Sequence, residues 1–303
     1  MDEVVRIVER LAPDLGEPSG DPEPLDGGIT NRNFRVSMGG RDYVIRVPGK
    51  DTSLLGIDRG TERDSGELAA RLGIAPGIAA MLTDPPCLVT EFVEGETMEP
   101  EQLREPARMA EVARSLRTLH DSGERVSSVF DSFRIVEGYA ETAAERGVDV
   151  PASYEEAHGH ARRIEAALSG PEHEPVTCHN DLLAANFIQG ERLWLVDWDY
   201  AGMGDRYFDL GNFAVNNGLD AGGAEAFLRS YFGEDPGERR LATLELFRFM
   251  SDFREAMWGV VQKGISDLDF DFDDYAAKHF ARMHRTASEP AFERAIQQAA
   301  AKE

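Results

Sequence analysis

The chain has 303 residues, of which 42 % are hydrophobic, enough to bury a sizeable core in about two domains. This argues against a coiled coil, a small disulfide scaffold or a wholly disordered chain. Lys and Arg number 32 against 56 Asp and Glu, and the net charge of −24 repels phosphate backbones and anionic lipid headgroups. We therefore expect neither nucleic acid nor a membrane as a partner.

Two features indicate the cellular compartment. Cys87 and Cys178 lie far apart without metal-like spacing, which is typical of reduced thiols in a cytosol, so the sequence predicts a cytoplasmic protein. Residues 1–11 alternate charged and apolar side chains and predict an amphipathic helix rather than a signal peptide. The sequence has no run of about 18 apolar residues that would predict a membrane span.

The first part of the chain is predicted to be rich in strands. Gly39-Gly40 separates two β-type runs and tolerates the positive φ angles of a tight hairpin. A later stretch of helical periodicity stops at Gly73, a typical helix terminator. The elements expected before residue 94, in chain order, are a linker at 13–24, strands at 33–38 and 43–47, a helix at 58–72, and strands at 78–82 and 88–93.

Helical periodicity dominates the rest of the chain. The expected helices are 101–120, 154–168, 208–218, 224–232, 239–262 and 275–294, with short apolar runs at 176–179, 187–189 and 193–196. The pattern predicts an α+β fold with a small antiparallel-sheet lobe, residues 1–93, and a larger mainly helical lobe, residues 94–303. A cleft at their junction is the place where we expect a small ligand.

The densest group of polar residues lies between residues 178 and 200. Asp181, Asn186 and Asp197 follow or flank β-type runs. One carboxylate and one amide oxygen, together with phosphate oxygens, suit Mg²⁺, and a carboxylate five residues before the amide can accept a hydrogen bond from an attacking hydroxyl. Taken alone, Asp181 is better interpreted as the cap of a helix beginning at Leu182. Its combination with His179, Asn186 and Asp197 favours phosphoryl transfer instead.

Six segments, in order and spacing, carry a family resemblance that extends over nearly the whole chain after residue 25. They are residues 25–36, 43–49, 179–186, 195–200, 208–212 and 254–262. They resemble the choline/ethanolamine kinases, within the aminoglycoside phosphotransferase and protein-kinase-like group. The resemblance implies a bilobal protein-kinase-like fold, ATP as co-substrate, Asp181 as catalytic base, and Asn186 and Asp197 as Mg²⁺ ligands. It also implies that Asp209 braces the catalytic loop.

The resemblance also assigns residues to ATP. Arg46 stands where protein kinases have their phosphate-pairing lysine, although it could be an exposed strand arginine. Glu62 would orient Arg46, or equally pair along its own helix with Arg59 or Arg63. The other residues expected at the nucleotide are Gly28, Thr30 and Asn31 in a loop over the phosphates, and Glu91 and Val93 at the adenine. The double glycine by itself is only a turn signal.

A carboxylate and an aromatic ring on one helix indicate how the acceptor binds. Glu255 and Trp258 are three residues apart and share a face, and such a pair suits an ammonium group. The alternative is that Trp258 is part of the core. Further substrate candidates are Asp199, Tyr200, Asn216 and Tyr275. Eukaryotic choline kinases carry tryptophan at the position of Glu255 and an acid at that of Asn216, so the pocket suits ethanolamine or another amino alcohol as well as choline.

The sequence thus predicts a kinase that uses ATP and Mg²⁺ to phosphorylate the hydroxyl of a small cationic alcohol, with choline and ethanolamine foremost. Two alternatives stay open at this point. One is an aminoglycoside, thiamine or sugar phosphotransferase of the same fold, and the other is a non-catalytic nucleotide-binding module. The late helices fit a dimer face and a monomer core equally, so the sequence sets no oligomeric state.

Overall fold

The computed structural model describes residues 2–25 and 31–301, and the chain divides into two compact units. Unit 1 comprises Met1–Met98 and Ala185–Asp199, and unit 2 comprises Glu99–Ala184 and Tyr200–Glu303. Unit 1 thus includes a segment from far along the chain in addition to the strand-rich first part. The lobe boundary that we placed between residues 93 and 94 stays a prediction.

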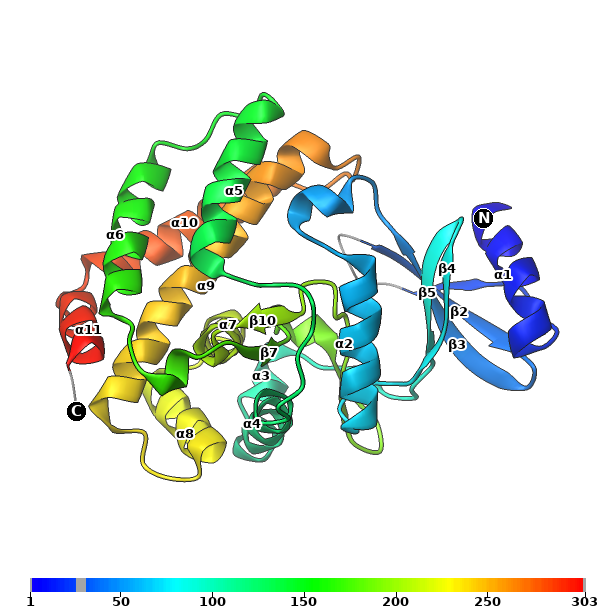
Figure 1. Cartoon of the computed structure of the whole chain (residues 1–303), viewed down its shortest axis with the longest axis horizontal. Helices are drawn as coiled ribbons and strands as arrows, with labels where there is room; N and C mark the ends of the chain where they lie inside the picture. The colour runs from blue at the N-terminus through cyan, green and yellow to red at the C-terminus, as the bar shows by residue number, and fades with distance from the viewer. Residues whose placement is uncertain (1, 26–30, 302–303) are drawn as a thin grey trace. The chain divides into compact units, whose positions relative to one another are not determined.

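Unit 1 is built on a five-stranded antiparallel sheet of order β1-β2-β3-β5-β4 (Figure 1). Its strands are β1 (Glu23–Leu25), β2 (Asn31–Met38), β3 (Arg41–Pro48), β4 (Ile78–Thr83) and β5 (Pro86–Glu91). Gly39 and Gly40, with φ of 58° and 80°, form the predicted turn between β2 and β3. The linker prediction is wrong for residues 13–15, which continue α1, and for residues 23 and 24, which begin the edge strand β1, where a proline is tolerated.

The two faces of this sheet have different coverings. Helix α1 (Asp2–Leu15) packs on one face, where its apolar stripe shares a core with alternate residues of β3 (Figure 1). Side chains alternate between the two faces of a strand, and Arg46 lies between the core residues Ile45 and Val47 of β3. It therefore points to the opposite face, where it contacts α2 (Arg59–Arg71). Asp58 caps α2 by accepting a hydrogen bond from the Thr61 N–H, and the helix ends before Gly73, as predicted.

A second, smaller sheet completes unit 1. Strands β6 (Glu96–Thr97), β8 (Phe187–Gln189) and β9 (Leu193–Leu195) form it in the order β6-β8-β9. Two 3₁₀ helices, η1 (Thr52–Leu55) and η3 (Ala184–Asn186), lie in the connecting segments. The Leu195 N–H donates to the carbonyl of Ile74, so this sheet is tied to the end of α2.

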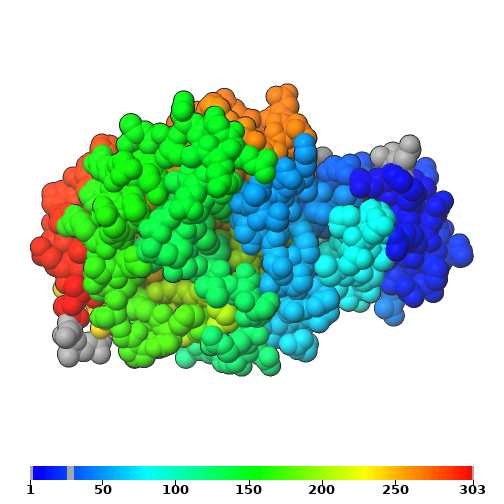
Figure 2. Space-filling model, turned by 45° about the horizontal axis from the view of Figure 1, so that its top comes forward, coloured from blue at the N-terminus to red at the C-terminus, as the bar shows by residue number. Residues whose placement is uncertain are grey.

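Unit 2 is assembled around one long helix, α9 (Gly237–Ile265), in which every residue from Phe249 to Gln262 is buried. A helix buried on all sides is the centre of its domain. The other elements are α3 (Pro100–Leu103), α4 (Pro106–His120), α5 (Ser132–Glu145), α6 (Ser153–Ala167), η2 (Pro171–His173), β7 (Val176–Cys178), β10 (Gly202–Gly204), α7 (Arg206–Asn216), α8 (Ala221–Phe232), α10 (Phe272–Ser288) and α11 (Pro290–Ala300). Helices α5, α7, α10 and α11 pack on α9, and α6 lies beside α11 at the surface (Figures 1 and 2).

The α+β class is confirmed, and three helix predictions need correction. The helix expected over 101–120 divides at Glu105, and that over 275–294 divides at Glu289, because a proline follows each of these residues and forces it into an extended conformation. Helix α5 was not predicted, since its few buried apolar residues make only a narrow stripe. None of the helices in the described residues has the length and apolar character needed to cross a membrane.

Candidate active site

A buried network of charges in unit 1 is centred on Arg46. Its Nη1 lies 3.1 Å from Glu62 Oε1, 2.7 Å from Asp197 Oδ1 and 3.0 Å from Asp199 Oδ1. Arg46 therefore is not an exposed strand arginine, and Glu62 is buried against it. Glu62, which the sequence assigned to the nucleotide, and Asp197, which it assigned to the metal, thus lie together on this guanidinium.

Arg59 is a second cation in this network. Its Nη1 donates to Glu62 Oε2 at 2.7 Å and to Asp199 Oδ1 at 2.9 Å, so Glu62 pairs with both arginines. Asn31 donates to Asp199 Oδ2 at 2.7 Å. Three carboxylates thus face two guanidinium groups, and burial together with the Asp199 charge raises the pKa of Glu62 to about 7.

The raised pKa of Glu62 predicts a pH dependence of stability. Between its ordinary value of 4.5 and about 7, the folded chain binds more protons at Glu62 than the unfolded chain does, so this contribution to stability falls as pH rises. Glu62→Gln removes the titration. We expect the free energy of unfolding of the wild type, relative to the variant, to fall by roughly 1–3 kcal/mol across that window in urea titrations. Equal pH dependence in both proteins would contradict the assignment.

Asn186 and Asp197 lie at the same end of the β8–β9 hairpin. Phe187 pairs with Leu195, and the Val196 N–H donates to the Asn186 carbonyl at 2.9 Å, which brings the two residues next to each other across the hairpin. Asp197 has φ of 67°, a left-handed conformation that costs energy for a residue with a side chain. Such strain concentrates at functional positions, and the amide and carboxylate here are hard oxygen donors that suit Mg²⁺.

The loop that carries Asp181 is anchored in unit 2 by α7. The carboxylate of Asp209 accepts the backbone N–H groups of His179 at 2.9 Å and Asn180 at 2.6 Å, so the prediction that Asp209 braces this loop is confirmed. Asn180 has φ of 67°, and its side chain donates to the Tyr200 carbonyl at 3.0 Å. Residues 181–183 form no helix, which removes the capping role considered for Asp181.

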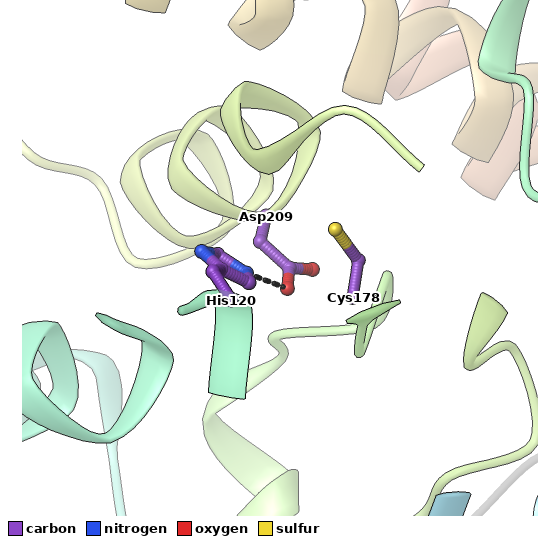
Figure 3. Close-up of side chains that lie close together, drawn as sticks. All are labelled: His120, Cys178 and Asp209. Atoms are coloured by element: carbon purple, nitrogen blue, oxygen red, sulfur yellow. Dashed lines mark hydrogen bonds and ion pairs between the residues drawn. The ribbon is translucent and has the colours of Figure 1, made fainter. Parts of the chain in front are cut away.

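Asp209 also belongs to a fully buried group with His120 and Cys178, drawn in Figure 3, whose ligand atoms lie within 4.8 Å of one another. His120 Nε2 lies 2.9 Å from Asp209 Oδ2, and its Nδ1 lies 2.7 Å from the Tyr231 hydroxyl. Although burial opposes it, the hydrogen bond from His120 lowers the pKa of Asp209. Burial raises the pKa of the Cys178 thiol. Through the hydrogen bonds of Asp209 to His120 and to the loop backbone, this group anchors the loop.

The anchoring role of Asp209 predicts a large loss of stability on truncation. Asp209→Ala leaves two buried N–H groups and His120 without their acceptor, and we expect it to lower the free energy of unfolding by roughly 3–5 kcal/mol in urea. Asp220→Ala is the matched control, since it removes only an exposed helix cap and costs about 1 kcal/mol. An equal loss of unfolding free energy in the two variants would show that Asp209 stabilises the loop no more than an exposed helix cap stabilises its helix.

Asp181 shares a buried cation with Glu255. Arg254 Nη1 donates to Glu255 Oε1 at 2.7 Å and lies 3.9 Å from Asp181 Oδ1. The remaining carboxylate oxygen of Glu255 accepts the Tyr275 hydroxyl at 2.7 Å. The two acids that the sequence assigned to the acceptor hydroxyl and to its amine therefore lie on one guanidinium within unit 2.

Aromatic rings surround this pair of acids. Trp258 Nε1 donates to the Tyr200 hydroxyl at 2.7 Å, and the Trp258 ring meets the Tyr275 ring edge-on with centroids 5.4 Å apart. The Arg254 guanidinium lies 4.0 Å from the centre of the Tyr200 ring. Trp258 is buried, as its core interpretation required, and it also contacts the predicted acceptor residues. Four of those residues thus lie in one group, namely Tyr200, Glu255, Trp258 and Tyr275.

The other predicted residues lie elsewhere. Asp199 is in the Arg46 network of unit 1, and Asn216 is the last residue of α7, with its amide nitrogen buried and unpartnered among the described residues. Glu91 ends β5, and Val93 follows two residues later. Gly28 and Thr30 lie outside the described residues. The roles of all these residues in binding stay predictions.

Sequence reasoning assigned no role to Arg254 and saw Arg59 only as a helix neighbour of Glu62. A signal for Arg254 was present, because Arg254 and Glu255 are the only charged residues between Asp252 and Lys263. Adjacent opposite charges inside an otherwise apolar helix indicate a buried ion pair, since unpaired charges are rarely buried. His120 carried no such signal, since it is 89 positions from Asp209 along the chain.

Comparisons with known proteins show the family of the chain. The model of the family described as "Phosphotransferase enzyme family" matches residues 21–244. Ethanolamine kinase 2 of Mus musculus is 29 % identical over 308 residues, covering 91 % of this chain and 78 % of that protein.

Solved structures extend the similarity to the fold. A choline/ethanolamine kinase family protein from Mesorhizobium loti superposes with a TM-score of 0.83 at 30 % identity, covering 99 % of this chain and 98 % of the other. The choline kinase LicA from Streptococcus pneumoniae has a TM-score of 0.80 at 24 % identity, covering 94 % of this chain and 99 % of the other. The predicted protein-kinase-like fold is thereby confirmed.

Proposed function

The chain belongs to the phosphotransferase enzyme family and, within it, to the choline/ethanolamine kinases, and from this we propose that it transfers the γ-phosphoryl group of ATP to the hydroxyl of a small amino alcohol. Choline and ethanolamine are the acceptors that we place first. We also propose a cytoplasmic location, which its two free, buried cysteines support.

One observation carries the choice of acceptor. Arg254 contacts both Glu255 and the proposed base Asp181. In the same unit Tyr275 donates to Glu255, and the Trp258 ring meets the Tyr275 ring. Aromatic faces and a carboxylate attract a desolvated ammonium group. An acceptor that carries both a cation and a hydroxyl is therefore the chemistry that this group suits, with Asp181 accepting the hydrogen bond of the attacking hydroxyl.

On the nucleotide side we propose that Arg46 binds phosphate oxygens and that Glu62 and Arg59 hold it in place. The guanidinium stays charged at any working pH and can contact two oxygens at once. Asn31 would act at the same phosphates with Gly28 and Thr30, and the backbone of Glu91 and Val93 would contact the adenine. Phosphoryl transfer requires mainly such positioning and charge neutralisation.

We propose that Asn186 and Asp197 hold Mg²⁺, which would neutralise charge on the phosphate oxygens of ATP when bound. The oxygen donors of these two residues, adjacent at one end of the β8–β9 hairpin, suit that ion. Arg46 Nη1 fixes the Asp197 carboxylate from one side at 2.7 Å.

A panel of acceptors tests the function. ADP release is measured by a coupled assay with ATP and Mg²⁺ in the presence of choline, ethanolamine, thiamine, sugars and aminoglycosides. We expect acceptor-dependent release with choline or ethanolamine and a lower kcat/KM with every other class. Activity confined to an aminoglycoside, thiamine or a sugar would replace the amino alcohol by that acceptor. A thermal shift with ATP without ADP release for any acceptor would instead indicate a non-catalytic nucleotide-binding module.

A further inference from the structure

Arg254 is a buried cation that has no role of its own in the function proposed above. Its side chain is 1 % exposed, in the middle of the fully buried stretch of α9. Nη1 donates to Glu255, and the guanidinium also interacts with Asp181 and Tyr139. Nε and Nη2 have no hydrogen-bond partner within 3.5 Å among the described residues. Because a guanidinium loses its hydration on burial, it requires compensation from nearby negative charge.

The carboxylates of Glu255 and Asp181 both lie near the Arg254 guanidinium, but at different distances. Glu255 makes a hydrogen bond at 2.7 Å, whereas Asp181 at 3.9 Å is too distant for one and interacts through its charge. At that separation the positive charge of Arg254 favours the ionised form of Asp181. A base that accepts a proton from an alcohol has to be ionised before the reaction.

We propose, on the basis of the function proposed above, that Arg254 is a positioning residue that keeps Asp181 ionised and oriented while it holds Glu255 for the ammonium group. Two carboxylates on one guanidinium leave one negative charge in excess. That single negative charge matches an acceptor with one cationic group, such as an amino alcohol. It gives no added attraction for an acceptor that carries a second cationic group.

The other charged or titratable groups around Asp181 do not replace this cation. On its own loop, His179 Nδ1 accepts the Asp181 N–H at 3.2 Å. Tyr139 of α5 and Tyr275 of α10 face it, and burial raises the pKa of each hydroxyl, so both are neutral at physiological pH. Glu255 of α9 is an acid, and Arg254 lies 3.9 Å from Asp181 Oδ1 as a cation.

The experiment separates the effect of Arg254 on Asp181 from its pairing with Glu255. Removing the arginine alone leaves two buried carboxylates unpaired, so the double variant Arg254→Met with Glu255→Gln removes a cation and an anion together. It is compared with Glu255→Gln alone, in which only the amine carboxylate is changed. For each protein, kcat, the KM of ATP and acceptor, and the pH dependence of kcat are measured with choline and ethanolamine.

We expect the double variant to have a kcat about 100-fold below that of Glu255→Gln, with the KM of ATP unchanged. In the pH profile of kcat, the acidic limb of the double variant should move to higher pH by about one unit, because Asp181 then loses the nearby positive charge. Arg254→Lys combined with Glu255→Gln should return the limb toward that of Glu255→Gln, since it restores the charge. A kcat within threefold of Glu255→Gln and an unmoved limb would overturn the proposal.

Two further results keep the test decisive. If the double variant does not fold, Arg254→Lys in the wild-type background replaces it, with an expected drop in kcat of about tenfold because an ammonium cannot contact both acids in the same way. An unchanged kcat in that variant would overturn the role of Arg254. If the wild type itself phosphorylates no amino alcohol, the proposed function fails, an outcome distinct from normal turnover with insensitivity to Arg254.

Discussion

Asp181→Asn is expected to lower phosphoryl transfer to the amino alcohol by roughly 10³–10⁴-fold, because an amide cannot take the proton of the attacking hydroxyl. The substitution preserves size, and Asp209 holds the loop through the backbone of His179 and Asn180. We therefore expect the fold and the affinity for ATP to stay near those of the wild type. Steady-state kinetics with the coupled assay, together with calorimetric titration of ATP, measure the two effects.

Asp149→Asn is the control for this experiment, since Asp149 is an exposed loop residue of the same unit. It should retain wild-type turnover. Wild-type turnover in Asp181→Asn would mean that another group takes the proton, and equal losses in both variants would point to a general effect of the substitution rather than to a base.

The second large effect is expected for Arg46→Met. Arg46 contacts Glu62, Asp197 and Asp199. Its removal takes this cation from Asp197 and leaves Glu62 and Asp199 with Arg59 alone. We expect kcat/KM for ATP to fall by about 10²–10³-fold, because a phosphate ligand is lost and the excess negative charge repels the triphosphate. Initial rates over a range of ATP concentrations, at saturating acceptor, measure the change.

Two variants make the result specific. Arg63→Met, on the same helix as Glu62, removes an exposed cation paired with the adjacent Asp64 and should leave kinetics unchanged. Arg46→Lys should recover only part of the activity, because a lysine does not present the planar fork that contacts several oxygens. If Arg46→Met kept a wild-type kcat/KM for ATP, the Arg46 network would be structural and would not bind phosphate.

Local patterns predicted the parts of the fold that depend on neighbouring residues. The β2–β3 hairpin follows from Gly39-Gly40 between two alternating strands, and the alternation also sets Arg46 on the face opposite to α1. The helix ending at Gly73 followed from its terminator in the same way. Prolines explain the two divided helices. These prolines were visible in the sequence, but the prediction followed the helical periodicity across them.

Long-range placement could not be predicted in this way. Asp199 and Tyr200 are adjacent in the chain and were assigned to one pocket, but the boundary of the two compact units passes between them. Asp199 lies on Arg46 and Arg59, whereas Tyr200 lies with Trp258. The sharing of Arg254 by Asp181 and Glu255 joins residues more than 70 positions apart, which periodicity does not encode.

The most direct test of the account is the identity of the product. Phosphorus NMR of a reaction that contains the wild-type protein, ATP, Mg²⁺ and either choline or ethanolamine resolves ADP, inorganic phosphate and a phosphomonoester. The account predicts a phosphomonoester of the amino alcohol that accumulates in a one-to-one ratio with ADP. ADP accompanied only by inorganic phosphate, or no ADP at all, would contradict it.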